Sequence, residues 1–192
     1  MTLLYLYYNQ PEALTFYTRL GYPKLPYEIV FVDDGSKEPL KLDWATVLRI
    51  DKDTPWNMPF ANNMGLWYIY LKNPNAKVLR TDIDHYFSPE DIEIINELEV
   101  KKNHIIKFKR GHLLPHHNTF LMNVSDLLEA GGYNVDYCGN YGYDDKELMD
   151  RLKRKGFAFE LSDINVRVNH SLKSVGERDT SVNYLKYEKS NS

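Results

Sequence analysis

Two aspartates, Asp82 and Asp84, stand two positions apart directly after an apolar segment, in the stretch KVLRTDIDHYFSPEDI. In an extended chain, residues at positions i and i+2 point to the same side, so these carboxylates repel each other unless water or a cation lies between them. Oxygen ligands of this kind suit Mg²⁺ or Mn²⁺, which proteins often bind through one or two carboxylates together with substrate phosphates. An isolated pair of aspartates is also common in exposed acidic loops, so the pair alone leaves both interpretations open.

A second group of polar residues follows another apolar segment. The stretch VFVDDGS carries Asp33 and Asp34 where a strand would leave the core. Such carboxylates can accept hydrogen bonds from a base or a ribose, but Asp, Gly and Ser are also the ordinary residues of a polar turn. Asn62 and Asn63, in WNMPFANNMGL, also have two interpretations. Their amides could contact a nucleotide near a helix start, or they could cap the helix.

Two further carboxylates, Asp144 and Asp145, lie at a predicted helix start in the stretch GYDDKEL. Asp144 and Glu147 have the spacing of a capping box, which predicts that Asp144 caps this helix. Asp145 is not needed for the cap, and a carboxylate in the first turn of a helix that faces a cleft can act as a general base. His170 ends a later predicted strand, where a lone histidine is more often a structural or surface residue than a ligand.

The apolar pattern predicts the elements that position these residues. Strands are expected at 3–8, 28–32, 45–50 and 76–81, and in HIIKFK, NTFLMN, FAFEL and NVRVN. Helices are expected at 11–20, 60–71, 88–98, 125–130 and 144–155, and within the tail at 174–187. Strand and helix alternate in the first half, which predicts a single-domain α/β fold whose mostly parallel central sheet has helices on both faces. Ligands of such sheets bind beyond the carboxyl ends of the strands, so both aspartate motifs should lie on one rim.

Composition limits the classes of function. The chain has 192 residues, of which 43% are hydrophobic and 27% charged, as in ordinary soluble domains. A net charge of −3 gives no reason to expect nucleic-acid binding, and the single Cys138 excludes a disulfide framework or a cysteine-rich zinc site. No segment is long and apolar enough for a transmembrane helix, and no signal peptide is evident, so we expect a cytoplasmic protein. The oligomeric state stays open.

The basic segment KKNHIIKFKRGHLLPHH, residues 101–117, is predicted to be mostly a solvated strand edge that could line an acceptor groove. Its histidines His112, His116 and His117 lack a clear metal-binding spacing.

Taken in order, these motifs resemble those of the GT-A-fold glycosyltransferases of family 2, with a C-terminal region similar to galactosyltransferases. YYNQPEAL is similar to the family's first strand and turn, VDDGS to its nucleotide-site motif, ANNMG to its A-R-N-x-G segment and TDIDH to its D-x-D motif. Residues 121–156 are similar to its G-G-[FY]-[DN] … G-x-[ED]-D-x-E-L region. Asn62 departs from the pattern because the family usually has an arginine there, and Asp144 stands where glutamate is frequent.

The resemblance implies one GT-A (Rossmann-like) domain over residues 1–192, with a nucleotide-sugar and metal half (1–100), an acceptor and catalytic half (101–173) and a C-terminal tail (174–192). It implies a hexosyltransferase that moves a sugar, with inversion, from a nucleotide-diphosphate donor, expected to be a UDP-sugar, to a glycan or other hydroxyl acceptor. It assigns nucleotide binding to Tyr8, Asn9, Asp33, Asp34, Asn62 and Asn63, binding of Mn²⁺ or Mg²⁺ to Asp82, Asp84 and His170, acceptor binding to Gly142, Tyr143 and Asp144, and base catalysis to Asp145.

Two other functions stay open. A sugar nucleotidyltransferase has a similar sheet and also uses Mg²⁺, but it usually carries a glycine-rich, basic loop where this chain has YYNQPEA. A non-catalytic nucleotide-sugar-binding or carbohydrate-binding homologue would explain Asn62, whereas the retained D-x-D motif and Asp145 favour an enzyme.

Overall fold

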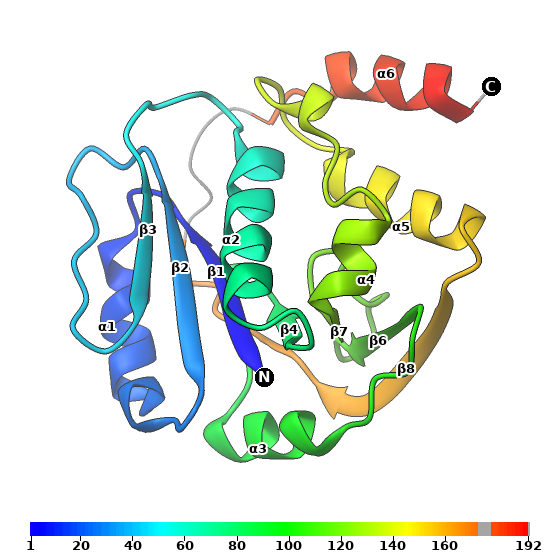
Figure 1. Cartoon of the computed structure of the whole chain (residues 1–192). Helices are drawn as coiled ribbons and strands as arrows, with labels where there is room; N and C mark the ends of the chain where they lie inside the picture. Colours follow the sequence, from blue (N-terminus) through cyan, green and yellow to red (C-terminus); the bar gives the residue numbers. More distant parts are fainter. Residues whose placement is uncertain (173–177, 192) are drawn as a thin grey trace.

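The computed structural model describes residues 1–172 and 178–191 and contains a seven-stranded sheet with helices on both faces (Figure 1). The strands lie in the order β3-β2-β1-β4-β7-β6-β8, and β7 is the one described strand of this sheet that runs antiparallel to its neighbours. The strands are β1 (Thr2–Tyr7), β2 (Glu28–Asp34), β3 (Thr46–Ile50), β4 (Lys77–Arg80), β6 (His104–Lys109), β7 (Phe120–Asn123) and β8 (Ala158–Asn165). The predicted α/β fold with a mostly parallel central sheet is confirmed.

Helices connect most of these strands, as the alternating sequence pattern predicts. They are α1 (Pro11–Arg19), α2 (Met58–Lys72), α3 (Pro89–Glu97), α4 (Val124–Glu129), α5 (Asp144–Arg154) and α6 (Ser181–Asn191), with short 3₁₀ helices η1 (Tyr22–Lys24) and η2 (Val135–Tyr137). None of the helices in the described ranges has the length and apolar character needed to cross a membrane.

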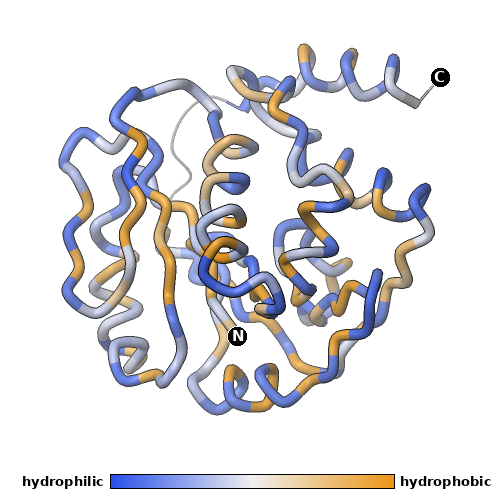
Figure 2. The backbone as a smooth tube through the Cα atoms, viewed as in Figure 1, coloured by the Kyte–Doolittle hydropathy of each residue, from blue (hydrophilic) through white to orange (hydrophobic). Residues whose placement is uncertain are grey.

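The sheet separates two apolar cores. Leu4 and Leu6 of β1 contribute to the core beneath α2, α4 and α5, whereas Leu3 and Tyr5 contribute to the core beneath α1 and α3. Successive side chains of a strand point to opposite faces, so a strand buried on both faces must be apolar along its whole length. Figure 2 shows this as hydrophobic colouring along the central strands.

Helix α3 begins as its sequence predicts. The Ser88 hydroxyl accepts a hydrogen bond from the Asp91 backbone N–H, and the Asp91 carboxylate accepts one from the Ser88 backbone N–H, both at 3.2 Å. Pro89 occupies the first turn, where the missing N–H has no intrahelical partner to lose. This reciprocal capping fixes where the chain turns after the TDIDH motif.

The prediction of a solvated strand edge for residues 101–117 is wrong. Strand β6 lies between β7 and β8, and Ile105, Ile106, Lys107 and Phe108 are buried. The charged sequence is misleading because Lys107 is buried with its amine bonded to backbone carbonyls. The predicted tail helix is α6, which begins at Ser181, and residues 174–177 of that prediction lie outside the described part of the chain.

A small two-stranded sheet joins the TDIDH motif to the late part of the chain. Strand β5 (His85–Tyr86) pairs antiparallel with β9 (Arg167–Val168). The Asn169 backbone N–H also donates to the carbonyl oxygen of Asp84 at 2.7 Å. This pairing brings the segment that contains His170 to the aspartates, although the two segments are far apart in the sequence.

Gly65 allows α2 to pack closely on β1 and β2. A Cβ at this position would lie 3.0 Å from Cγ2 of Val32 and still closer to Cδ1 of Leu4. Alanine is favoured over glycine by about 1 kcal/mol in an open helix, but overpacking a core costs about 1–3 kcal/mol. We therefore expect Gly65→Ala to lower the free energy of unfolding measured by chemical denaturation. Leu4→Val should recover part of the loss in the double variant, and a stability gain in Gly65→Ala would contradict this packing.

Candidate active site

A cleft of about 710 Å³ opens beyond the carboxyl ends of β1, β2 and β4. Both aspartate motifs reach it, because parallel strands end on the same edge of the sheet. Its volume lies within the range of about 300–1,000 Å³ that is usual for small-molecule sites. Five residues predicted for the site line it, namely Tyr8, Asp34, Asp82, Asp84 and His170.

The other predicted site residues do not line this cleft in the described part of the chain. They are Asn9, Asp33, Asn62, Asn63, Gly142, Tyr143, Asp144 and Asp145. Several of them hold the surrounding loops, and the contacts of the individual residues explain how.

The two carboxylates of VFVDDGS, Asp33 and Asp34, lie in different surroundings. Asp33 is fully buried and accepts hydrogen bonds from the backbone N–H groups of Ser36 and Leu40 and from the Arg49 guanidinium. Asp34 faces the cleft and accepts a hydrogen bond from the Asn57 side chain at 2.9 Å. Burial raises the pKa of Asp34 to about 6, while the hydrogen bond from Asn57 acts in the opposite direction.

The amides of α2 are committed to internal contacts. Asn63 accepts a hydrogen bond from the Tyr133 N–H and donates one to the Tyr133 carbonyl oxygen, both at 2.8 Å. Asn62 is fully buried and accepts a hydrogen bond from Nε of Arg80, whose Nη2 also donates to Asp82 at 2.9 Å. Arg80 of β4 is itself fully buried. Its guanidinium therefore lies beside Asn62, the position where the family resemblance predicts an arginine.

Two buried tyrosines hold the backbone of the TDIDH motif from below. The Tyr17 hydroxyl of α1 donates to the carbonyl oxygens of Ile83 and His85, at 3.1 and 3.0 Å. The Tyr22 hydroxyl donates to the Phe87 carbonyl oxygen at 3.1 Å. These bonds satisfy backbone carbonyl groups in and beside β5, and they hold the segment that carries Asp82 and Asp84 against α1 and η1.

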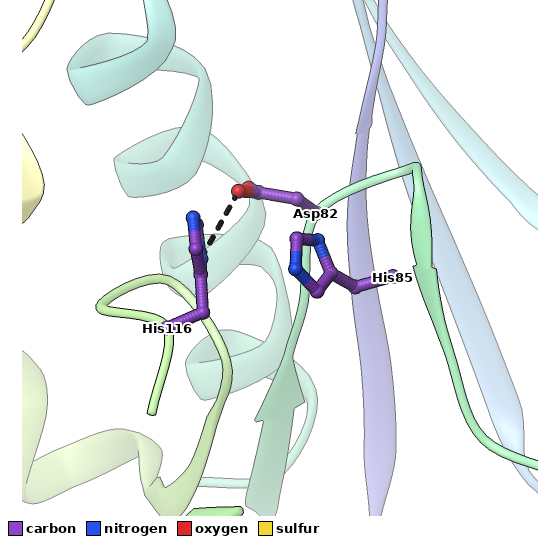
Figure 3. Close-up of side chains that lie close together, drawn as sticks. All are labelled: Asp82, His85 and His116. Atoms are coloured by element: carbon purple, nitrogen blue, oxygen red, sulfur yellow. Dashed lines mark ion pairs between the residues drawn. The ribbon is translucent and has the colours of Figure 1, made fainter. Parts of the chain in front are cut away.

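Asp82, His85 and His116 form a cluster whose candidate ligand atoms all lie within 4.8 Å of one another (Figure 3). Oδ2 of Asp82 is 3.4 Å from Nδ1 of His116, and the two imidazole rings have centroids 4.5 Å apart. Burial, followed by the nearby His85, lowers the pKa of His116 against the effect of the Asp82 charge, so a neutral imidazole is favoured. One carboxylate and two imidazoles are a suitable donor set for Mn²⁺ and other transition metals.

His85 is oriented by the neighbouring aspartate. Its Nδ1 lies 2.8 Å from Oδ1 of Asp84, which leaves Nε2 as the free nitrogen. Both Nε2 of His85 and Nδ1 of His116 are buried and have no hydrogen-bond partner among the described residues. A carboxylate that fixes the far nitrogen of an imidazole is the usual support of a metal-binding histidine, so the residues present fit a cation.

The loop that carries His116 is held by a buried lysine. Nζ of Lys107 donates to the carbonyl oxygens of both His116 and His117. Burial lowers the pKa of Lys107 to about 7, and the charges of Asp145 and Asp82 act in the opposite direction. Sequence reasoning missed His116 because its approach to Asp82 depends on the path of the loop between β6 and β7. His85 had a usable signal, since it directly follows the D-x-D motif.

The predicted capping box at Asp144 is wrong. Tyr143 is the N-cap residue, with a left-handed φ of 65° and no side-chain cap, and Asp144 is the first residue of α5. Glu147 instead accepts a hydrogen bond from Nε of Arg151 at 2.8 Å. The left-handed turn at Tyr143 directs Asp144 inward, where its Oδ2 is buried without a partner among the described residues. Burial, followed by the charge of Asp145, raises the pKa of Asp144 to about 7.

Asp145 is less buried than Asp144 and lies near the loop between β6 and β7 that carries His116 and His117. One carboxylate oxygen is 3.8 Å from Nδ1 of His117, and the other accepts a hydrogen bond from the Lys146 N–H. The side chain of Asp145 is 24% exposed, so solvent can reach it.

An aromatic pair that sequence reasoning missed also lines the cleft. The rings of Trp56 and Tyr141 have centroids 4.6 Å apart, and the Arg178 guanidinium lies 5.5 Å from the centre of the Tyr141 ring. Trp56 has a φ of 46°, which is uncommon for a bulky residue and often accompanies functional sites. No local spacing in the sequence relates these residues, so only the fold brings them together.

No family model matches this chain, and no curated protein matches it. Among solved structures, GalNAc-T7 with UDP, GalNAc and Mn²⁺ matches 98% of this chain and 47% of that chain, with a TM-score of 0.58 and 11% identity. A nucleotidyl transferase from Methanothermobacter matches 98% of both chains, with a TM-score of 0.51 and 13% identity. The chain therefore spans about half the length of GalNAc-T7. At these identities the comparisons confirm the GT-A-like, Rossmann-like fold, while membership of family 2 stays a prediction.

The raised pKa of Asp144 predicts a pH-dependent stability. The folded protein holds this proton up to about pH 7, whereas the unfolded chain releases it near pH 4, so this group makes folding less favourable as pH rises between those values. We expect Asp144→Asn to raise the free energy of unfolding at pH 8, on the order of 2 kcal/mol, with about half of that effect or less at pH 5. Denaturation at both pH values, without metal or nucleotide, measures the difference.

Asp150→Asn in the same helix is the matched control. Burial acts to raise the pKa of Asp150, but hydrogen bonds from Tyr187 and Lys146 outweigh it and lower the pKa. Its stabilising contribution is present at both pH 5 and pH 8, so the control should lose stability at both. Equal effects of Asp144→Asn at the two pH values would show that Asp144 is ionised throughout.

Proposed function

We propose that this protein is a metal-dependent glycosyltransferase that moves a hexose-type sugar, with inversion, from a nucleotide diphosphate to a hydroxyl acceptor. The observation that carries the proposal is the Asp82–His85–His116 cluster in a cleft at the ends of parallel strands. The fold that this chain shares with GalNAc-T7, whose structure holds UDP, GalNAc and Mn²⁺, supports it. A UDP-sugar donor and a glycan acceptor are the proposed substrates.

Asp82, His85 and His116 would hold Mn²⁺ in preference to Mg²⁺, because imidazole is a poor ligand for magnesium. When bound, the cation would offset the charge that develops on the diphosphate leaving group. Asp84 orients His85 through Nδ1 of the imidazole, and His170 also lines the cleft. The sequence-based ligand set of Asp82, Asp84 and His170 is the alternative, and the experiment below separates the two sets.

We assign the nucleotide to the part of the cleft beside Tyr8 and Asp34. Tyr8 offers an aromatic ring, and its hydroxyl bonds to Asp53, which also lines the cleft. Asp34 offers a carboxylate to a base or ribose hydroxyl. Two other residues predicted to bind the nucleotide, Asn9 and Asp33, would hold the turn that follows Asp34. Asn62 and Asn63, also predicted to bind it, would act indirectly, Asn62 through Arg80 and Asn63 through Tyr133.

Asp145 is the proposed general base. Its carboxylate would take the proton of the acceptor hydroxyl as the acceptor oxygen bonds to the anomeric carbon and the bond to the phosphate oxygen breaks. The nucleoside diphosphate then leaves with the bonding electron pair. Gly142, Tyr143 and Asp144 are proposed to border the acceptor, and the buried Asp144 keeps a proton to near neutral pH.

Metal dependence of nucleotide binding tests the cation site. We expect calorimetry to show tighter UDP binding when Mn²⁺ is present. In His85→Ala and in His116→Ala, the factor by which Mn²⁺ increases the affinity for UDP should be at least tenfold smaller. His112→Ala is the matched control, because His112 is exposed in the same loop as His116. If Asp84→Ala and His170→Ala remove the metal effect while His85→Ala and His116→Ala keep it, the sequence-based ligand set is correct. Equal UDP affinity with and without Mn²⁺ would refute both sets.

Turnover of a labelled UDP-sugar tests the base. Asp145→Asn keeps the size of the side chain but removes its basicity, so we expect normal UDP and Mn²⁺ binding with a 10²–10⁴-fold slower transfer. Asp144→Asn should retain most of the rate. Loss of activity in Asp144→Asn with near-normal turnover in Asp145→Asn would reverse the two roles. Binding without turnover in the unmodified protein would favour a non-catalytic homologue, and pyrophosphate release from UTP and a sugar phosphate would favour a nucleotidyltransferase.

A further inference from the structure

Helix α6 lies against the loop of residues 137–143, which leads directly into Asp144 and Asp145 (Figure 1). Much of α6 is exposed, yet Asn183 on this helix is fully buried. Its Nδ2 lies within hydrogen-bond distance of three carbonyl oxygens, those of Tyr137 at 3.1 Å, Asn140 at 2.8 Å and Gly142 at 2.9 Å. One side-chain amide thus joins three points of the loop to the C-terminal helix.

The loop needs such support because its backbone is unusual. Gly139 and Gly142 have φ values of 88° and 84°, and Tyr143 follows with a φ of 65°. The left-handed conformation costs a non-glycine residue roughly 1–2 kcal/mol, so surrounding contacts must hold it in place. The ring of Tyr143 has such contacts, with centroids 5.5 Å from Tyr184 and 5.3 Å from Tyr187 of α6.

The opposite side of the same loop faces the cleft. The Gly139 N–H donates to the Pro55 carbonyl oxygen at 3.1 Å, and Tyr141 packs on Trp56. Tyr141 and Trp56 both line the cleft. The loop is therefore clamped between α6 on one side and the cleft wall on the other.

We infer that Asn183 is a positioning residue of the active site, which fixes the loop of residues 137–143 so that Tyr141 lines the cleft and Asp145 faces the acceptor. The role in catalysis rests on the proposed function, whereas the ordering of the loop does not. Asn183 itself touches neither the cleft nor the metal cluster. Its effect on transfer is transmitted through the loop backbone.

Asn183→Asp tests the inference. The variant has almost the same shape but places carboxylate oxygens, in place of N–H donors, against three carbonyl oxygens. We expect amide hydrogen exchange of residues 138–146 to become at least tenfold faster, with unchanged exchange in β1 and β2. Leu185→Ala is the matched control, because Leu185 is on the same helix and is 60% exposed. Asn183→Ala removes the donors without adding charge, and serves where the aspartate variant does not fold.

Activity gives the second measurement. We expect kcat to fall at least tenfold in the Asn183 variants, while the affinity for UDP with Mn²⁺ changes less than threefold, because the nucleotide and metal residues lie on other loops. Unchanged loop exchange, an equal increase throughout the sheet, or a faster-exchanging loop with normal kcat would each overturn the inference. If the unmodified protein transfers no sugar but the Asn183 variants still loosen the loop selectively, the positioning of the loop stands and the proposed function fails.

Discussion

A buried positive charge at the end of β4 controls how the site is assembled. The Arg80 guanidinium has no exposed surface and bonds to Asn62 of α2 and to Asp82 of the acidic motif. A charge withdrawn from water costs several kcal/mol unless partners offset it, so the elements that surround Arg80 cannot be rearranged independently. Asp144 is near enough for Arg80 to affect its pKa, although it forms no hydrogen bond with it. One guanidinium therefore connects α2, the acidic motif and α5.

In each acidic pair of the site, one aspartate makes internal contacts or is buried, and the other is directed toward the cleft, the histidine cluster or solvent. Asp33 holds a turn, while Asp34 faces the cleft. Asp84 orients an imidazole, while Asp82 lies in the histidine cluster. Asp144 is buried, while its neighbour Asp145 is partly exposed. Adjacent carboxylates repel each other. When one of the two has an internal partner or a proton, the repulsion falls, and the other carboxylate can still present its charge to a ligand.

Local patterns in the sequence predicted most of the fold. Strands and helices follow from the spacing of apolar residues, and the start of α3 follows from Ser88 and Pro89. These signals involve residues that are close in the sequence, so they can be recognised without knowledge of the fold. His116 could not be found in this way, because its place beside Asp82 results from a loop held by Lys107. The spacing of Asp144 and Glu147 was misleading, because Tyr143 adopts a left-handed conformation that spacing does not reveal. Asn183 is a single polar residue in a polar helix, and only its burial distinguishes it.

The pairing of β5 with β9 has a consequence for synthesis on the ribosome. Strands β1, β2, β3 and β4 are made first and pair with one another, so this part of the sheet can form early. Strand β5 must wait for residues 167–168, and the loop before α5 must wait for residue 183. The nascent chain can therefore carry the acidic motif on a folded half-sheet before His116, strand β9 and Asn183 are made. If the proposed function holds, affinity for the nucleotide should appear as one of the last events of folding.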